Sequence, residues 1–178
     1  MRQEVIIAGF GGQGVIKAGV LLATGAMKDG KHCTHFPSYG AEMRGGTANC
    51  SVIISTSEIA SPIIAEPDTV IVMNEPSLDK FELRLKKGGL LIYNSSLIHK
   101  IPRRTDIDIL AVPANEIAEE LGTVKCANMA VIGAYISKTK AVTLESVKSS
   151  LSVVFPKLKE DLIALNKNAL DKGAKLIV

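Results

Sequence analysis

Short apolar runs alternate along this chain with longer segments in which apolar residues recur at helical spacing. We expect strands in the apolar runs at residues 4–8, 31–36, 68–73, 90–93 and 107–112. We expect helices at residues 15–27, 77–85, 114–121, 126–137, 144–154 and from Pro156 to about Lys172. Strands that alternate with helices predict an α/β fold, here a three-layer α/β/α sandwich around a mostly parallel, Rossmann-like sheet.

Two further segments bear on whether this sheet is all-parallel. Residues 49–55 alternate between polar positions and the apolar Val52 and Ile54, which predicts another strand. Residues 58–64 are expected to return beside it as a short partner. A hairpin of this kind would make the sheet mixed, because its two strands run antiparallel.

The composition fits a single domain over residues 1–178, with 47% hydrophobic residues and only 4% aromatic ones. The net charge of +3 is spread along the chain, which argues against a nucleic-acid-binding surface. No apolar run is long enough to span a membrane, and the first residues lead straight into a strand, so we expect a cytoplasmic protein.

The three cysteines, Cys33, Cys50 and Cys126, are far apart and contain no C-x-x-C pair. We therefore expect no disulfide, and no metal or iron–sulfur site built by this chain alone. Cys50 is expected to be a small buried hydrophobe.

A glycine cluster follows the first predicted strand. Gly9, Gly11 and Gly14 have the G-x-G-x-x-G spacing, in the order strand, glycine turn, helix. Such a turn can present backbone N–H groups and a helix N-terminus to an anion, or it can serve only as a tight turn. No acidic residue follows the second strand to hold a ribose, which argues against ordinary NAD binding. Gln13 can act as a helix cap or as a ligand contact.

A second glycine-rich loop follows the second predicted strand and contains Tyr39, Glu42 and Arg44. The Arg44 guanidinium can clamp a carboxylate or phosphate, or tie the loop to Glu42. We expect this loop and the glycine turn to lie side by side, because both follow the carboxyl end of a strand. Asn128 can cap the helix that begins near it or contact a ligand, and the cap is the more economical interpretation.

The chain has no motif that equips it as a self-sufficient enzyme. It contains no G-x-S-x-G, no H-E-x-x-H and no phosphate-binding G-x-x-x-x-G-K-[ST] sequence. A second function class is therefore open at this point, an independent nucleotide- or coenzyme-binding module built on the glycine turn.

Three segments together resemble the gamma subunit of 2-oxoacid:ferredoxin oxidoreductases over essentially the whole chain. They are Gly9-Phe10-Gly11-Gly12-Gln13-Gly14-Val15, the stretch from Ser38 to Cys50, and Cys126-Ala127-Asn128-Met129. The chain is also similar to the corresponding domain of single-chain pyruvate:ferredoxin oxidoreductases.

The resemblance implies a subunit without catalytic residues of its own, in an enzyme that joins the acyl group of a 2-oxoacid to coenzyme A and passes electrons to ferredoxin. It places thiamine diphosphate between alpha- and beta-type subunits, and iron–sulfur clusters in other chains, including a ferredoxin-like delta subunit. The candidate cofactor contacts are Gly9, Gly11, Gly12, Gln13, Gly14, Tyr39, Glu42, Arg44 and Asn128. The form of the Ser38–Gly46 segment and the size of the chain favour 2-oxoglutarate as substrate, with pyruvate, branched-chain 2-oxoacids and aryl pyruvates as alternatives.

Overall fold

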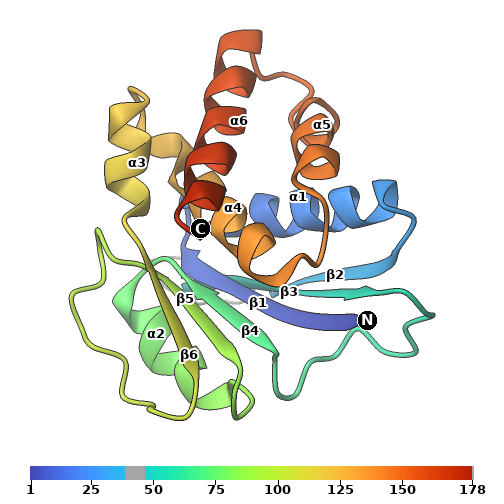
Figure 1. Cartoon of the computed structure of the whole chain (residues 1–178), viewed down its shortest axis with the longest axis vertical. Coiled ribbons are helices and arrows are strands. Elements are labelled where there is room, and N and C mark those ends of the chain that lie inside the picture. The colour runs from blue at the N-terminus through green and yellow to red at the C-terminus, as the bar shows by residue number, and fades with distance from the viewer. Residues whose placement is uncertain (39–46, 178) are drawn as a thin grey trace.

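The computed structural model describes residues 1–38 and 47–177 of the chain (Figure 1). Within these residues, one sheet of six strands has the order β2-β3-β1-β4-β5-β6. The strands are β1 (Arg2–Phe10), β2 (His32–Ser38), β3 (Thr47–Ser55), β4 (Thr69–Val72), β5 (Leu90–Asn94) and β6 (Asp108–Val112).

Helices cover both faces of the sheet, which gives the expected three α/β/α layers (Figure 1). The α-helices are α1 (Val15–Lys28), α2 (Glu75–Phe81), α3 (Ala114–Glu120), α4 (Ala127–Thr139), α5 (Leu144–Val154) and α6 (Glu160–Lys175). Two short 3₁₀ helices are η2 (Glu82–Arg84) and η3 (Val124–Cys126). Helix α2 lies on one face of the sheet, and α1, α4, α5 and α6 lie on the other. Within the described part of the chain, no helix is long and apolar enough to cross a membrane.

The sheet is mixed, as expected, and the strand predicted at residues 49–55 makes it so, but this strand has other partners than expected. Strands β1, β4, β5 and β6 pair in parallel, whereas β3 pairs antiparallel with both β1 and β2. The short strand expected at residues 58–64 is wrong, because this segment is irregular. Neither edge of β3 has room for it, since β2 and β1 occupy both, and Pro62 can donate no ladder hydrogen bond.

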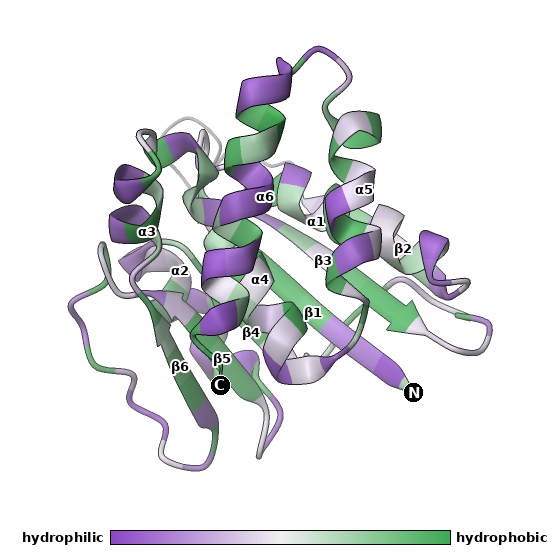
Figure 2. Ribbon diagram, turned by 45° about the horizontal axis from the view of Figure 1, so that its top comes forward, coloured by the Kyte–Doolittle hydropathy of each residue, from purple (hydrophilic) through white to green (hydrophobic). Residues whose placement is uncertain are grey.

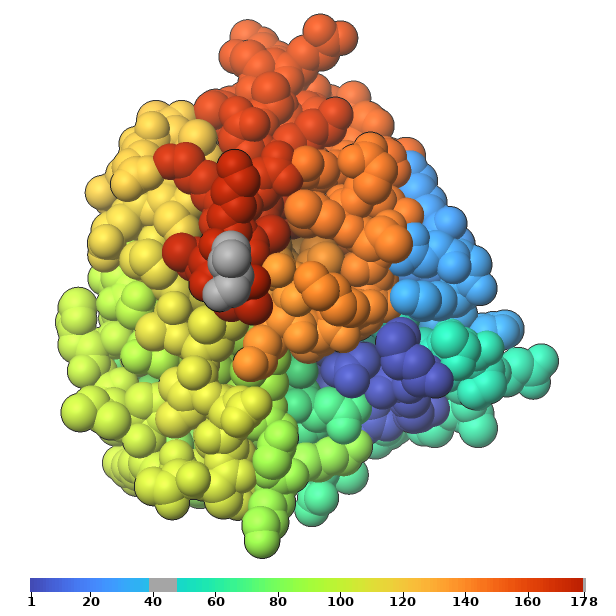
Figure 3. Space-filling model, viewed as in Figure 1, coloured from blue at the N-terminus to red at the C-terminus, as the bar shows by residue number. Residues whose placement is uncertain are grey.

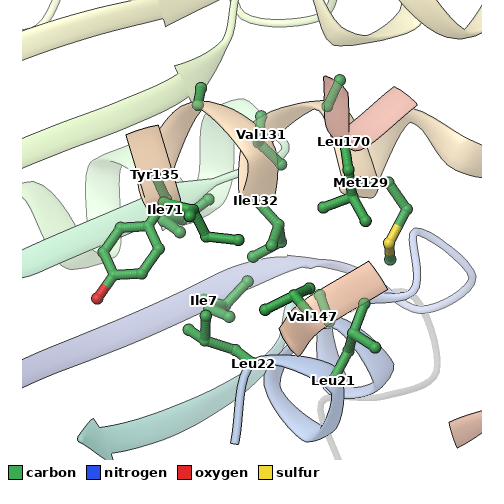
Figure 4. Packing of buried hydrophobic residues seen from close by; sticks show 14 of the residues in the cluster. Ile7, Leu21, Leu22, Ile71, Met129, Val131, Ile132, Tyr135, Val147 and Leu170 are labelled. Carbon is green, nitrogen blue, oxygen red and sulfur yellow. The ribbon is translucent and has the colours of Figure 1, made fainter. Parts of the chain in front are cut away.

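The core consists of two apolar layers that the alternation along β1 separates. Val5 and Ile7 face α1 and α4, while Ile6 and Ala8 face α2. Figure 2 shows the same strand changing from hydrophilic near the N-terminus to hydrophobic in its middle. In Figure 4, Ile7 meets side chains from α1 and α4 in the larger of these layers. Most of the stability should come from this burial of valine, isoleucine, leucine and alanine.

Helix α4 is buried on nearly all sides because it lies between the sheet and α6. The two helices approach at Gly133 and Gly173. A Cβ added to Gly133 would lie 2.0 Å from the carbonyl oxygen of Leu170, and one added to Gly173 would lie 1.9 Å from that of Ala130. Backbone contact at this crossing therefore requires glycine in both helices.

The sequence also predicts Asn115 as the N-cap of the helix at residues 114–121 and Thr143 as the N-cap of the helix at residues 144–154, and these predicted helix ends are partly right. The Thr143 hydroxyl caps α5 by accepting from the Ser146 amide at 3.2 Å, as expected. Helix α6 begins at Glu160 rather than at Pro156. Asn115, expected to cap α3, lies inside its first turn, and Asn94 takes over part of this role by accepting from the Ala114 amide at 3.2 Å.

A long connection joins β5 to the edge strand β6, and a buried carboxylate holds it. Glu82 is only 3% exposed, and its Oε1 accepts from the backbone amides of Arg103 at 2.5 Å and Arg104 at 2.8 Å. Arg104 in turn pairs with Asp106 at 2.7 Å. The connection is thus fixed to the end of α2, in addition to the contact that the buried Ile98 makes with the core.

Candidate functional site

The glycine turn between β1 and α1 is shaped by both conformation and space. Gly12 and Gly14 have φ angles of 97° and 71°, in the left-handed region that favours glycine. Gly9 has ordinary dihedral angles, but a Cβ there would lie 2.6 Å from Oε1 of Gln13 and 2.9 Å from Cβ of Met73. Gly11 and Gly12 are exposed at the tip of the turn.

The Gln13 side chain fixes this turn from within. Its Oε1 accepts from the Phe10 amide at 2.7 Å, and its Nε2 donates to the carbonyl oxygen of Met73 at 3.0 Å. It therefore bridges the ends of β1 and β4. Gln13 is not the helix cap, since Gly14 occupies that position, and its amide group is already used within the chain.

Asn128 reaches the same turn from the start of α4. Its Nδ2 donates to the carbonyl oxygen of Gly14 at 3.2 Å. The cap interpretation of Asn128 is wrong, because Cys126 is the N-cap of α4. Asn128 is 7% exposed, and its Oδ1 has no hydrogen-bond partner in the described part of the chain. A buried acceptor without a donor is costly, so this oxygen is available to a ligand.

A hollow of about 180 Å³ opens next to Asn128, and we call it the glycine-turn hollow. It is lined by Gly12, Gln13, Met73, Leu97, Asn115, Val124, Lys125, Ala127 and Asn128. These residues come from the glycine turn, from segments beyond the carboxyl ends of β4, β5 and β6, and from η3 and α4. Ligands of α/β sheets collect at this edge.

The rim of the hollow combines apolar and cationic groups. Leu97 and Val124 are 42% and 51% exposed, so they present apolar surface at the rim. Lys125 is the one ionisable side chain among the residues that line it. The geometry therefore suits binding of a group that carries negative charge and hydrogen-bond donors, and it offers no acid–base pair for catalysis.

An apolar hollow of about 180 Å³ lies on the other side of Asn128 and shares Lys125 and Asn128 with the first. Its remaining wall includes the half-buried Leu158, Leu162 and Leu165 near and along α6. The Asn128 side chain is thus part of the wall of both hollows.

The second predicted loop cannot be placed. Tyr39, Glu42 and Arg44 lie outside the described residues, so their expected position beside the glycine turn stays a prediction. The strands on either side of it are placed: Phe10 pairs with Thr47, and Ser38 pairs with Asn49. Strand β3 lies between β1 and β2, which the sequence did not predict.

Several site residues had no signal in the sequence. Met73 and Asn115 follow strand ends and could have been suspected on that ground. Lys125, Leu97 and Val124 lie in segments without periodicity, and only the fold brings them together.

Cys33 and Cys50 line neither of these hollows, whereas Cys126, at the start of α4, lines the apolar one. Cys50 is fully buried, as expected, and burial raises the pKa of its thiol to about 12. Over residues 1–38 and 47–177, no group of three or more His, Cys, Asp or Glu side chains is arranged to hold a metal ion.

Comparison with known proteins gives consistent relatives. The family described as pyruvate ferredoxin/flavodoxin oxidoreductase matches residues 4–176. Ketoisovalerate oxidoreductase subunit VorA of Methanothermobacter marburgensis is 37% identical over 172 residues, which cover 96% of this chain but 36% of VorA. The chain therefore spans about a third of the length of that relative.

Two further proteins match along nearly their full length. 2-Oxoglutarate synthase subunit KorC of Methanocaldococcus jannaschii is 34% identical over 173 residues, which cover 94% of this chain and 92% of KorC. The crystal structure of the keto/oxoacid ferredoxin oxidoreductase gamma subunit from Geobacter sulfurreducens superimposes with a TM-score of 0.86 and 30% identity, over 98% of this chain and 95% of that one.

Proposed function

This chain belongs to the pyruvate ferredoxin/flavodoxin oxidoreductase family, and from this membership we propose that it acts as the gamma-type subunit of a multi-subunit 2-oxoacid:ferredoxin oxidoreductase. The family expected from the three sequence motifs is thereby confirmed. In the proposed enzyme, alpha- and beta-type subunits hold thiamine diphosphate. A ferredoxin-like delta subunit carries electrons towards ferredoxin.

The observation that carries this proposal is the chemistry of the glycine-turn hollow. It presents one cation, Lys125, and one buried acceptor without a donor, the Oδ1 of Asn128. These groups can bind and orient a ligand, but they supply neither a nucleophile nor a base to react with it. A role in holding a cofactor that reacts on another subunit fits this arrangement.

Coenzyme A is the cofactor whose groups fit these residues. Its phosphates suit Lys125 and the exposed amides of Gly11 and Gly12, and an amide N–H of its pantetheine arm suits Oδ1 of Asn128. The coenzyme supplies the thiol that accepts the acyl group, and the residues of this chain bind and orient it.

The hollow has only about 180 Å³. Sites that enclose a whole ligand usually measure about 300–1,000 Å³. Part of the coenzyme must therefore lie against another subunit. Tyr39, Glu42 and Arg44 complete the proposed contact set from the second loop, with the Arg44 guanidinium as a second anion-binding group.

We propose 2-oxoglutarate as the substrate. This choice rests on the sequence of the Ser38–Gly46 segment and on the full-length likeness to a protein named 2-oxoglutarate synthase subunit KorC. The likeness to VorA keeps a branched-chain 2-oxoacid as the competing choice. Residues on the partner subunits would make most of the selection.

The test is anaerobic co-expression of this chain with alpha-, beta- and delta-type subunits from the same organism. We expect a stable complex that reduces a viologen dye only when a 2-oxoacid and coenzyme A are both present. Among 2-oxoglutarate, pyruvate, 3-methyl-2-oxobutanoate and phenylpyruvate, 2-oxoglutarate should give the highest kcat/KM. A preference for another 2-oxoacid would overturn the substrate but not the subunit role.

A matched pair of variants tests the cofactor site. Lys125→Ala should raise the KM for coenzyme A by roughly fivefold with little change in kcat, because it removes one charge-assisted contact. Lys157→Ala, at an exposed position outside the hollow, should leave both constants unchanged. A chain that purifies alone from its own host and binds NAD or ATP tightly would instead favour an independent binding module.

A further inference from the structure

A third hollow lies at the opposite edge of the sheet from the glycine turn, and we call it the amino-edge hollow. Its volume is about 330 Å³. Gln3 of β1, Thr69 of β4, the connection from Lys86 to Leu90, and the end of α4 at Lys138 and Thr139 surround it. In Figure 3 the dark blue N-terminal residues, the orange end of α4 and the green β4–β5 connection meet on the face that is shown.

The charges around this hollow leave an excess of cations. The positive charge of Lys86 is balanced by carboxylates, because its Nζ lies 2.8 Å from Asp68 and 3.8 Å from Glu4. The hydrogen bond to Asp68 raises the pKa of Lys86. Lys87 and Lys138 form no ion pair with any described residue within 4 Å. Lys87 lowers the pKa of Asp106 only as a weak, more distant influence.

The one acidic side chain of the lining is already occupied. The two carboxylate oxygens of Asp68 accept from different donors, Oδ1 from Lys86 at 2.8 Å and Oδ2 from the Glu4 amide at 2.8 Å. Asp68 therefore offers little further attraction to a cation. Lys87 and Lys138, which have no ion-pair partner among the described residues, therefore give the hollow a positive charge.

A buried hydroxyl lies behind the wall of this hollow. Tyr135 is 0% exposed, and its hydroxyl has no hydrogen-bond partner in the described part of the chain. Burial raises its pKa, the nearby Thr139 side chain lowers it and the Asp68 charge raises it, and both of these residues line the hollow. Figure 4 shows the hydroxyl oxygen pointing away from the other labelled core side chains. It is a neutral donor without an acceptor.

We infer that the amino-edge hollow binds an anionic group, a carboxylate or a phosphate, between Lys87 and Lys138, with the Tyr135 hydroxyl as its innermost donor. Two lysine ammonium groups supply the charge, and the Gln3 amide and Thr139 hydroxyl supply neutral donors beside them. Thr139, which lines the hollow, adjoins Tyr135, because its hydroxyl donates to the Tyr135 carbonyl oxygen at 2.8 Å. The site is separate from the coenzyme site, because it lies at the other ends of the strands.

The test is a titration of the purified chain, followed by amide NMR shifts, with inorganic phosphate and separately with a hexaglutamate peptide. Ionic strength is held constant with sodium chloride. We expect saturable shifts at Gln3, Thr69, Gly88, Gly89 and Thr139. Saturation by phosphate would identify a free anion as a sufficient ligand, and saturation by the peptide alone would assign the site to a protein carboxylate.

Variants separate this site from general attraction to a basic protein. Lys87→Ala combined with Lys138→Ala should weaken binding about tenfold, and Lys157→Ala combined with Lys167→Ala, which removes the same charge at exposed positions elsewhere, should not change it. Tyr135→Phe should weaken binding about threefold without unfolding the chain. Shifts that never saturate, or that are equal in the double variant, would overturn the proposal, and unchanged binding in Tyr135→Phe would remove the hydroxyl from it.

Discussion

The side chain of Asn128 donates a hydrogen bond to the carbonyl oxygen of Gly14 across 114 positions of sequence, at 3.2 Å. This bond ties the start of α4 to the start of α1, and it is the tie that positions the free Oδ1 at the glycine-turn hollow. The two helices are therefore linked at this edge. Coenzyme binding and local stability should both depend on it.

Asn128→Asp is predicted to destabilise the chain, because a carboxylate oxygen would face the Gly14 carbonyl oxygen where an N–H now donates. We expect the free energy of unfolding to fall by about 1–3 kcal/mol at pH 7, as for a buried acceptor that loses its donor. Urea denaturation measures this change. As the control, Asn166→Asp on the half-buried face of α6 should cost less. Equal costs would argue against a special role for the Gly14 contact.

Gln13→Glu should remove one of the two hydrogen bonds of the Gln13 side chain and keep the other, so that their contributions to stability can be measured separately. The variant keeps an acceptor for the Phe10 amide but loses the donor to Met73. We expect a loss of about 1–2 kcal/mol of stability, with the Phe10 amide still protected from hydrogen exchange. Gln13→Ala should expose that amide as well. If both variants left the Phe10 amide equally protected, the turn would be held by something other than this side chain.

The glycines of the turn should differ in their sensitivity to alanine. Gly12→Ala meets no atom within 4 Å and suffers only from its φ of 97°, so it should cost about 1–2 kcal/mol. Gly14→Ala adds a clash, because its Cβ would lie 2.4 Å from Nδ2 of Asn128, and should cost about 1–3 kcal/mol more. In an Asn128→Ala background this extra cost should largely disappear. Thermal unfolding of wild type, Gly14→Ala, Asn128→Ala and the double variant measures this as a double-mutant cycle. Additive costs of the two substitutions would show that the clash does not occur.

Asp29 should make the chain sensitive to acid. Burial by itself would raise its pKa, but hydrogen bonds from Ser146 and Thr143 outweigh burial, so the folded-state pKa lies below the ordinary value of 3.8. The stabilisation is therefore complete above that value and is lost as the pH falls through the lower folded-state pKa. Asp29→Asn should lower stability by about 1–2 kcal/mol at pH 7 and progressively less towards pH 3.

Urea denaturation between pH 7 and pH 3 tests this prediction. Asp171→Asn serves as its control, since Asp171 pairs with Lys148 at a more exposed position. A difference between wild type and Asp29→Asn that stays constant over this range would contradict the assignment.

Tyr135→Phe should stabilise the free chain while it weakens anion binding. The hydroxyl is buried without a partner, so its removal should raise the free energy of unfolding by about 1 kcal/mol. Saturating phosphate should then stabilise wild type more than the variant. Differential scanning calorimetry with and without phosphate measures both effects. A variant that is less stable in both conditions would show that the hydroxyl has a structural partner.

Most of the fold could be predicted because its elements have strong local patterns. The apolar runs of β4 and β5 and the helical spacing in α1 needed no tertiary information. The pairing of β3 could not be read in this way, because the pattern of a strand does not state which neighbour it takes. The start of α6 was misplaced for a related reason, since proline is compatible with a first helical turn but does not require one.

The candidate site was predictable where the backbone conformation requires a particular residue type, such as glycine. Gly12 and Gly14 have positive φ angles, and the glycine spacing indicated such a turn. The roles of Gln13 and Asn128 were left open because an amide side chain can cap, bridge or bind, and only its neighbours decide. Lys125 was missed altogether, because a lysine near the surface carries no signal until the fold shows what it faces.

The buried carboxylate of Glu82 should also protect the β5–β6 connection from proteolytic cleavage. Arg103 and Arg104 form a dibasic sequence, which is a cleavage site for trypsin-like enzymes. Both of their backbone amides donate hydrogen bonds to Glu82. Cleavage requires an extended, detached backbone, so the polypeptide must first release the carboxylate before it can be nicked. The long connection is thereby protected at its most vulnerable point, and β6 keeps its attachment to the rest of the molecule.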